Sequence, residues 1–190
     1  MNWSDVTLEK FQKLQQIIKL EDNTDRMLSI MELFYGEDVT DLPVTEFNKL
    51  SKELAFLQNE VPTNHIVNKV TINNRKYKID AVLGHLSTAQ YVDFVNYMNQ
   101  PDNTDKVLSV FFIPENHKYN DGYDMQQVIA DMNQLPIDIA LSESFFFRRQ
   151  LEKFIKIFQS SSTHQIQKSK MTKDQKKQLI NLLHQSLDLV

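Results

Sequence analysis

Histidine, the side chain most suited to acid–base catalysis near neutral pH and a common metal ligand, occurs five times in this 190-residue sequence. No pair has the i, i+4 spacing that places two imidazoles on one helix face, and there is no H-E-x-x-H motif. Cysteine is absent, which excludes thiol nucleophiles and cysteine-ligated zinc. We therefore expect no metal site. The five histidines are His65, His85, His117, His164 and His184.

One loop brings several potentially reactive residues together in the sequence. Aligning Gly122 with the glycine of a calcium-binding EF-hand puts His117 at ligand position one and Val128 at position twelve. Neither residue can fill its position, so an EF-hand is excluded. A small hydrolase that pairs His117 with Asp121 or Asp124 is an alternative, and it requires these side chains to share a cleft. A turn followed by a helix cap at Asp124 is the simpler interpretation.

Glycine spacing and composition exclude further classes. Gly36, Gly84 and Gly122 lie far apart, so there is no dinucleotide-binding G-x-G-x-x-G, no Walker loop and no G-x-S-x-G nucleophile elbow. No run approaches the roughly 20 apolar residues of a membrane-spanning helix. The first five residues lack the basic and apolar stretches of a secretory signal. We therefore expect a non-enzymatic protein without a cofactor and without a membrane partner.

An internal repeat indicates how the chain is organised. The tetrapeptide Asp-Asn-Thr-Asp at 22–25 recurs at 102–105, and apolar positions before and after it recur at the same offset. In each copy the spacing predicts one helix before the tetrapeptide and another after it, capped by the short polar side chains. We expect two pseudo-repeated helical modules, at about 5–60 and 87–159. The recurring pairs are Phe11/Tyr91, Leu14/Phe94, Ile17/Tyr97, Ile18/Met98 and Leu28/Leu108.

Residues 66–80, between the modules, alternate apolar and polar side chains on either side of Asn73-Asn74. Asparagine tolerates positive φ, so the pattern predicts a small β-hairpin with a two-residue turn. A lone hairpin is marginally stable, so it must pack on the helices or on a partner. The apolar run 107–113 remains open between helix, which the repeat favours, and strand, which its β-branched and aromatic residues favour.

The chain after residue 159 has a different composition. Ser160-Ser161-Ser162-Thr163 is typical of a linker, and leucines at helical spacing follow it. We expect a helical domain at 1–159, a linker at 160–171 and a C-terminal basic amphipathic helix at 172–190. Thr172 opens that helix as part of a capping box. The predicted fold class is mainly α.

Charge is distributed unevenly along the sequence. From Arg148 onward nine Lys and Arg face three Asp and Glu, a net charge of +6, whereas residues 1–147 carry 12 against 22, a net charge of −10. A solvated helix face is the favoured interpretation of the basic residues, and an acidic protein partner comes second. Phosphate contacts with nucleic acid are possible but not favoured, because leucines rather than aromatic residues are interleaved. The lysines concerned are Lys168, Lys170, Lys173, Lys176 and Lys177.

Phe145, Phe146 and Phe147 are consecutive on a predicted helix and therefore point in three directions. A helix buried on all sides is slightly favoured over a partner interface with arginines at its rim. The C-terminal helix offers a second surface that is apolar and basic. The candidate partner interface consists of Phe145, Phe146, Phe147, Arg148, Arg149, Lys173, Lys176, Lys177, Leu179, Leu182 and Leu183.

Three segments carry a resemblance to a known group. They are Trp3-Ser4-Asp5-Val6-Thr7-Leu8-Glu9-Lys10-Phe11, Thr71-Ile72-Asn73-Asn74-Arg75-Lys76-Tyr77, and Phe112-Ile113-Pro114 with Tyr119-Asn120-Asp121-Gly122-Tyr123. Over most of residues 3–155 the sequence resembles small helical proteins encoded in the morphogenesis regions of tailed bacteriophages. That group includes tail-assembly-chaperone-like proteins, baseplate-associated proteins and virion proteins of gut Bacteroides phages.

The resemblance implies a non-catalytic protein of phage assembly. Its partners are then other phage structural proteins of the tail, baseplate or head–tail connector, in a homo- or hetero-oligomer. The implied location is the virion, after assembly in the host cytoplasm. A tail-assembly chaperone that binds a tail component transiently is the first alternative, and a nucleic-acid-binding accessory protein is the second. No catalytic residues are implied, because the group has no active site to match.

Overall fold

The computed structural model describes all residues except 37–38, 80–85, 99, 101–102 and 188–190. The first part of the chain forms the 3-10 helix η1 (Trp3–Asp5), α1 (Leu8–Ile17), α2 (Asn23–Tyr35), α3 (Val44–Glu53), the 3-10 helix η2 (Leu54–Gln58), β1 (Lys69–Ile72) and β2 (Arg75–Ile79). The second part forms α4 (Thr88–Met98), α5 (Thr104–Phe111), β3 (Phe112–Pro114), α6 (Met125–Met132), α7 (Ile137–Lys168) and α8 (Lys173–Leu187). The predicted mainly α fold class is confirmed.

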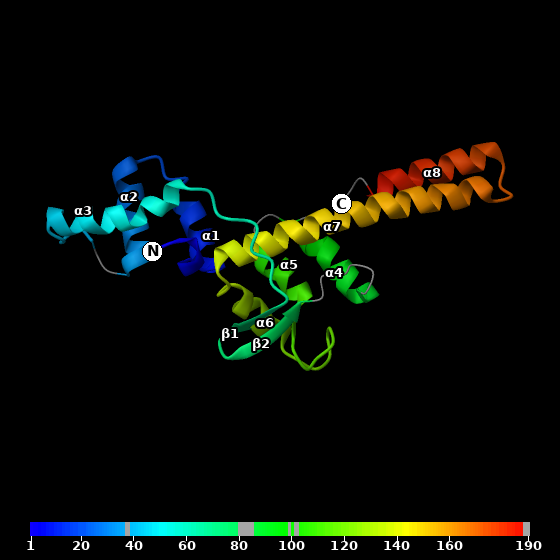
Figure 1. Cartoon of the computed structure of the whole chain (residues 1–190). Helices are drawn as coiled ribbons and strands as arrows, with labels where there is room; N and C mark the ends of the chain where they lie inside the picture. Colours follow the sequence, from blue (N-terminus) through cyan, green and yellow to red (C-terminus); the bar gives the residue numbers. More distant parts are fainter. Residues whose placement is uncertain (37–38, 80–85, 99, 101–102, 188–190) are drawn as a thin grey trace.

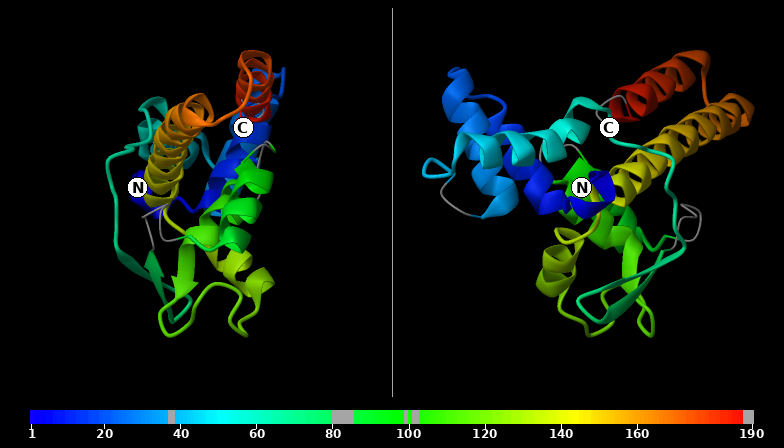
Figure 2. Two further views of the ribbon diagram at one scale, coloured as in Figure 1. Left: turned by 90° about the vertical axis from the view of Figure 1, so that its right-hand side faces the viewer. Right: turned by 60° about the vertical axis from the view of Figure 1, so that its left-hand side comes forward.

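The elements form an elongated molecule. In Figure 1, α7 runs from the middle of the molecule to one end, where α8 folds back along it, and α1, α2 and α3 lie at the opposite end. The small sheet and helices α4 to α6 lie beside the first half of α7. Figure 2 shows the same arrangement from two further sides.

Both copies of the repeat fold as helix–turn–helix, with α1 packed on α2 and α4 packed on α5. Asp22 is the N-cap of α2, and its Oδ1 accepts hydrogen bonds from the backbone N–H groups two and three residues on, at 2.7 and 2.9 Å. In the second copy Asn103 is the N-cap of α5, while Asp102 lies outside the described residues. The matching positions Leu14 and Phe94 are both buried. Two pseudo-repeated helical modules are therefore present.

The predicted hairpin is confirmed, and its turn consists of Asn73 (φ 49°) and Asn74 (φ 62°). Two consecutive left-handed residues match the right-handed twist of the paired strands. A third strand, β3, pairs antiparallel with β2 and extends the hairpin to a sheet. The run 107–113 contains both predicted structures, because α5 ends in it and β3 begins at Phe112. Pro114 disfavours helical geometry at the residue before it, which helps to end α5 here.

Helix α5 lies in the centre of the core, against α4, α6 and α7. Its residues from Val107 to Phe111 are all buried, and the ring of Phe111 stacks on Phe147 of α7. At the other end of the body, Trp3 of η1 contacts Phe56 of η2 edge to face. Such aromatic pairs contribute about 0.5–1.5 kcal/mol beyond the area that they bury. Both modules and α7 therefore share one core.

The expected linker at 160–171 is wrong for residues 160–168, which belong to α7. Serine in a helix interior costs only about 0.5 kcal/mol relative to alanine, and neither glycine nor proline interrupts the segment. Packing of α8 along α7 stabilises the helix through this stretch. The chain turns only at Ser169 (ψ 163°), after which Thr172 and Gln175 form the predicted capping box, at 3.0 and 3.4 Å.

Candidate functional site

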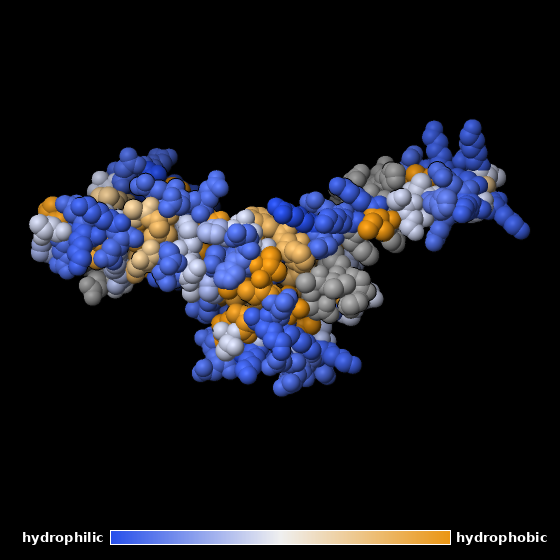
Figure 3. All heavy atoms as spheres, in the orientation of Figure 1, coloured by the Kyte–Doolittle hydropathy of each residue, from blue (hydrophilic) through white to orange (hydrophobic). Residues whose placement is uncertain are grey.

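The C-terminal half of the candidate interface lies on the α7–α8 arm, defined as residues 148–187 (Figure 1). The arm carries nine Lys and Arg and two acidic residues. Among the arm side chains that the structure describes, four large apolar ones are exposed: Ile157 (69%), Met171 (38%), Leu179 (40%) and Leu182 (60%). Hydrophilic side chains cover most of this end in Figure 3, with single hydrophobic residues among them. The arm is therefore a basic surface with apolar side chains that this chain does not cover.

The predicted residues of α8 have different roles. Lys173 and Lys177 are exposed and can meet a partner. The ammonium of Lys176 donates to the backbone carbonyl of Gln167 at 2.8 Å, so this lysine caps the end of α7 instead. The side chain of Leu183 lies outside the described residues.

The three consecutive phenylalanines differ in burial, because consecutive residues of a helix point in different directions. Phe147 is fully buried in the stack on α5, Phe146 is half-buried, and Phe145 is 44% exposed. Arg148 and Arg149 are both exposed. The favoured interpretation of a helix buried all round is therefore wrong at Phe145, and Phe147 is core rather than interface.

A polar cluster that the sequence did not reveal fixes residues 59–68, here called the strap, to the first turns of α7. Asp138 Oδ2 accepts a hydrogen bond from Ser4 Oγ at 2.7 Å and lies 3.1 Å from Nδ1 of His65 in the strap. The backbone N–H of His65 donates to Ser142 Oγ at 3.0 Å. Burial opposes ionisation of Asp138, but the hydrogen bonds from His65 and Ser4 outweigh it and lower the pKa of Asp138. Side chains of α7 thus accept hydrogen bonds from the strap backbone, as a neighbouring strand would in a sheet.

Ser4, His65 and Asp138 have the residue types of a hydrolase triad but not its geometry. In a triad the imidazole lies between the hydroxyl and the carboxylate. Here the Ser4 hydroxyl donates to the same carboxylate oxygen that His65 contacts. The arrangement joins the N-terminus, the strap and α7, and it activates no nucleophile.

Glu143 holds the next position of the strap. Its Oε1 accepts from the backbone N–H of Val67 at 2.8 Å, whereas its buried Oε2 has no hydrogen-bond partner among the residues that the structure describes. The residue is fully buried, and burial raises the pKa of the Glu143 carboxyl. This carboxyl therefore makes a structural contact at an electrostatic cost.

A second polar cluster joins the hairpin to α6 through the fully buried Asp131. Its carboxylate accepts from Asn73 Nδ2 at 2.9 Å, from Arg75 Nη1 at 2.8 Å and from the Tyr77 hydroxyl at 2.5 Å. Burial opposes ionisation, but hydrogen bonds from Tyr77, Asn73 and Arg75 outweigh it and lower the pKa of Asp131. The expectation that the hairpin leans on the helices is met here.

The loop around His117 is a capped turn. His117 Nδ1 lies 2.9 Å from the backbone carbonyl of Asp121, not from a carboxylate oxygen. Asp124 is the N-cap of α6 and accepts from the backbone N–H of Gln126 at 2.9 Å. Asn120 and Gly122 both have positive φ, as the turn requires. These contacts support the turn-and-cap interpretation and provide no acid–base pair for the alternative hydrolase.

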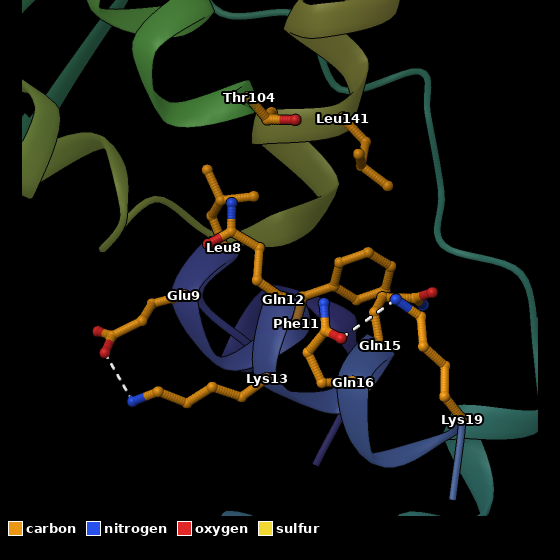
Figure 4. Close-up of a pocket in the computed structure, with 10 residues that line it drawn as sticks. All are labelled: Leu8, Glu9, Phe11, Gln12, Lys13, Gln15, Gln16, Lys19, Thr104 and Leu141. Carbon is orange, nitrogen blue, oxygen red and sulfur yellow. Dashed lines mark hydrogen bonds and ion pairs between the residues drawn. The ribbon is translucent and has the colours of Figure 1, made fainter. Parts of the chain in front are cut away.

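A groove of about 480 Å³ runs along α1 (Figure 4). It lies between α1 of the first module, Thr104 of the second and Leu141 of α7. The charged Glu9 on its wall pairs with Lys13 at 2.7 Å, and this hydrogen bond lowers the pKa of Glu9. The lining residues are Leu8, Glu9, Phe11, Gln12, Lys13, Gln15, Gln16, Lys19, Thr104 and Leu141.

Within the described part of the chain, no group of three His, Asp or Glu side chains is arranged to hold a metal ion. Over the same residues, no helix has the length and apolar character needed to cross a bilayer. Comparison with protein-family models, with curated proteins and with solved structures finds no match.

Proposed function

We propose that this chain is a non-catalytic structural or assembly protein of a tailed bacteriophage, acting through protein–protein contacts of the α7–α8 arm. The observation that carries the proposal is the exposure of Ile157, Leu179 and Leu182 on a helix pair that extends away from the core (Figure 1). Exposed apolar side chains next to cations are common where a partner binds. The assignment to a phage is supported by the sequence resemblance. The proposed position of the chain in the particle is the tail, the baseplate or the head–tail connector.

The test is the composition of purified particles of the phage that encodes the chain. A built-in component is found by mass spectrometry in fixed proportion to known virion proteins. A transient tail-assembly chaperone is found bound to a tail component in infected cells but is absent from particles. Failure to find the chain in either fraction overturns the proposal.

The arm itself is tested by the double variant Leu179→Asp/Leu182→Asp. Both side chains are exposed, so the variant folds but loses the apolar contact and is depleted from its complex. Val44→Asp is the matched control, since Val44 is 74% exposed on α3, which lies at the end of the molecule opposite the arm (Figure 1). Equal incorporation of both variants contradicts a binding role of the arm.

Nucleic-acid binding is the second candidate, because the cations of the arm include the exposed Lys153, Lys156 and Lys168. It requires duplex DNA to bind with an affinity that falls steeply as salt rises. Binding by the Leu179→Asp/Leu182→Asp variant with unchanged affinity would favour this function over the protein–protein one.

A further inference from the structure

The outer face of the three-stranded sheet carries a cluster of lysines. On the inner face, Tyr77 of β2 is buried and donates a hydrogen bond to Asp131. Because side chains alternate along a strand, the neighbours of Tyr77, Lys76 and Lys78, point to the opposite face. Lys69 of β1 lies directly across from Lys78 and shares that face. The outer face therefore carries three lysines on two adjacent strands.

Lys69 and Lys78 form a like-charge pair across the two strands. The backbone N–H of Ile79 donates to the carbonyl of Asn68 at 3.1 Å, so the next pair along, Lys69 and Lys78, occupies a non-hydrogen-bonded position. Opposite side chains lie closest together at such positions. Like charges placed directly opposite each other destabilise a sheet. An anion beside the two ammonium groups would remove this cost.

Glu115 supplies part of the negative charge that this cluster requires. Its Oε1 accepts from the ammonium of Lys69 at 2.6 Å. This hydrogen bond, together with the charges of Lys76 and Lys78, lowers the pKa of the Glu115 carboxyl. Residues 69–79 and 112–119 contain five of the 12 Lys and Arg of residues 1–147, but only one of the 22 Asp and Glu. The cluster is therefore a basic region within an acidic body.

A hollow of about 550 Å³ opens beside the cluster, between the end of β2, the start of α4 and the segment after β3. Its volume falls within the range of about 300–1,000 Å³ that is typical of small-molecule sites. The lining combines two lysines and a histidine with two isoleucines and a tyrosine, which are Lys78, Lys118, His117, Ile79, Ile113 and Tyr119. The hollow thus offers cations together with aliphatic and aromatic surface.

The two rings of this lining are held by residues outside the hollow. The hydroxyl of Tyr119 donates to Asp93 Oδ2 of α4 at 2.7 Å. The imidazole of His117 packs edge to face on Tyr123, and its Nδ1 lies 2.9 Å from the backbone carbonyl of Asp121. A ligand that contacts these rings therefore finds them already ordered, which lowers the entropy cost of binding.

We infer that this hollow binds a nucleoside phosphate, with the phosphate at Lys78 and Lys118 and the base against Tyr119 and the isoleucines. Lysine binds phosphate as a point charge, and aromatic and apolar side chains bind the faces of bases. The ligand is a free nucleotide rather than a nucleic-acid strand. Residues 1–147 carry a net charge of −10, so an extended strand meets repulsion beyond the cluster. The site uses no residue of the arm and goes beyond the proposed function.

The experiment titrates the four ribonucleoside triphosphates, one at a time and without divalent cations, into the full chain by isothermal titration calorimetry. Tripolyphosphate provides the phosphates without a nucleoside, and single-stranded oligothymidylate provides a strand. The test variant is Lys78→Gln/Lys118→Gln. Lys173→Gln/Lys177→Gln is the matched control, because it removes the same charge from two exposed lysines of the arm. Lys118→Gln alone changes an exposed side chain and replaces the test variant if that variant fails to fold.

At least one triphosphate is expected to bind at one site per chain, about tenfold or more tighter than tripolyphosphate, because a stacked base contributes that much affinity. The test variant is expected to lose at least about tenfold in affinity, since charge-assisted contacts are removed, whereas the control binds as wild type. Without ligand, the melting temperature of the test variant is expected to equal or exceed that of wild type, because Lys78→Gln relieves the like-charge pair with Lys69.

Three outcomes overturn the inference. They are the failure of all four triphosphates to bind, an equal loss of affinity in the test variant and the control, and binding of tripolyphosphate or oligothymidylate as tight as that of every triphosphate. Each leaves the proposed function standing, since that depends on whether particles or infected-cell complexes contain the chain.

Discussion

The ring of Phe147 lies flat on the ring of Phe111, with centroids 3.6 Å apart and planes inclined by 9°. This stack joins α7 to α5, the central helix of the core, and thereby fixes the direction in which the arm leaves the body. Phe145, two residues earlier, is 44% exposed. Two residues of one aromatic run, Phe145 and Phe147, therefore have opposite roles.

Replacing Phe147 with alanine is expected to lower the free energy of unfolding by about 3–5 kcal/mol, because a large cavity opens in the core. Phe145→Ala removes the same side chain at an exposed position and is expected to cost less than about 1 kcal/mol. Urea denaturation of both variants measures the difference. An equal loss of unfolding free energy in the two variants would contradict the finding that Phe147 is buried and Phe145 is exposed.

The sequence predicts the features that depend on neighbouring residues. Asp22 caps α2 and Asn73-Asn74 turns the hairpin because the determinants lie within a few residues. Which phenylalanine is buried depends instead on where α5 lies, and no local pattern contains that information. The prediction of a linker at the serine-rich segment is wrong for the same reason, because α8 stabilises a helix that composition alone does not favour.

The strap cluster could not be predicted at all. Ser4, His65 and Asp138 come from three distant segments, and the strap has no hydrophobic period. The basic charge of the arm and the helical spacing of its leucines can be predicted, because they depend only on composition and on neighbouring residues. The sequence places Lys176 in the interface. Its contact with the carbonyl of Gln167 is not visible in the sequence, because that contact depends on how the chain turns between α7 and α8.

The two asparagines of the Asn73-Asn74 turn are expected to respond differently to replacement by glycine. Asn74→Gly is expected to stabilise the protein by up to about 1 kcal/mol, because glycine adopts φ 62° without strain. Asn73→Gly gains the same backbone relief but loses the hydrogen bond from Asn73 to Asp131, so it is expected to be less stable than Asn74→Gly. Thermal and urea unfolding compare the two, and the reverse order would contradict the role of Asn73.

Asp131 is expected to be the most sensitive polar residue of the hairpin contact. Asp131→Ala leaves the Tyr77 hydroxyl and Asn73 amide without their acceptor, and is expected to cost about 3 kcal/mol or more. Arg75→Ala removes a side chain that is 47% exposed and is expected to cost no more than about 1 kcal/mol. Urea denaturation at neutral pH tests both, and a neutral effect of Asp131→Ala would rule out this anchoring role.

Glu143 gives a prediction about pH. Burial raises the pKa of its carboxyl, so the folded state binds the proton more tightly than the unfolded state does. Its contribution to stability is therefore present below the ordinary pKa and is lost as pH rises through the raised value. Glu143→Gln keeps an oxygen for the N–H of Val67 without ionising, so its stability relative to wild type is expected to increase as pH rises from the ordinary glutamate pKa through the raised value.

Asp138→Asn is the control for that measurement, since the pKa of Asp138 is lowered. Its contribution is present above the ordinary pKa and is lost as pH falls, so the variant is expected to be less stable than wild type at neutral pH and to approach it in acid. Urea unfolding across the pH series separates the two behaviours. Parallel curves for wild type and Glu143→Gln would show that the carboxyl does not titrate abnormally.

Ser161 tests whether the arm is one continuous helix. It is exposed in the middle of the serine-rich stretch of α7, so proline there removes a backbone hydrogen bond and clashes with the preceding turn, at a cost of about 3 kcal/mol to the helix. Ser161→Pro is expected to lower helicity and to raise hydrogen exchange across 157–168 and α8, while the core around Phe147 keeps its protection. Ser161→Ala changes the same side chain and is expected to gain up to about 0.5 kcal/mol. If residues 160–171 were a linker instead, proline would leave both helicity and exchange unchanged.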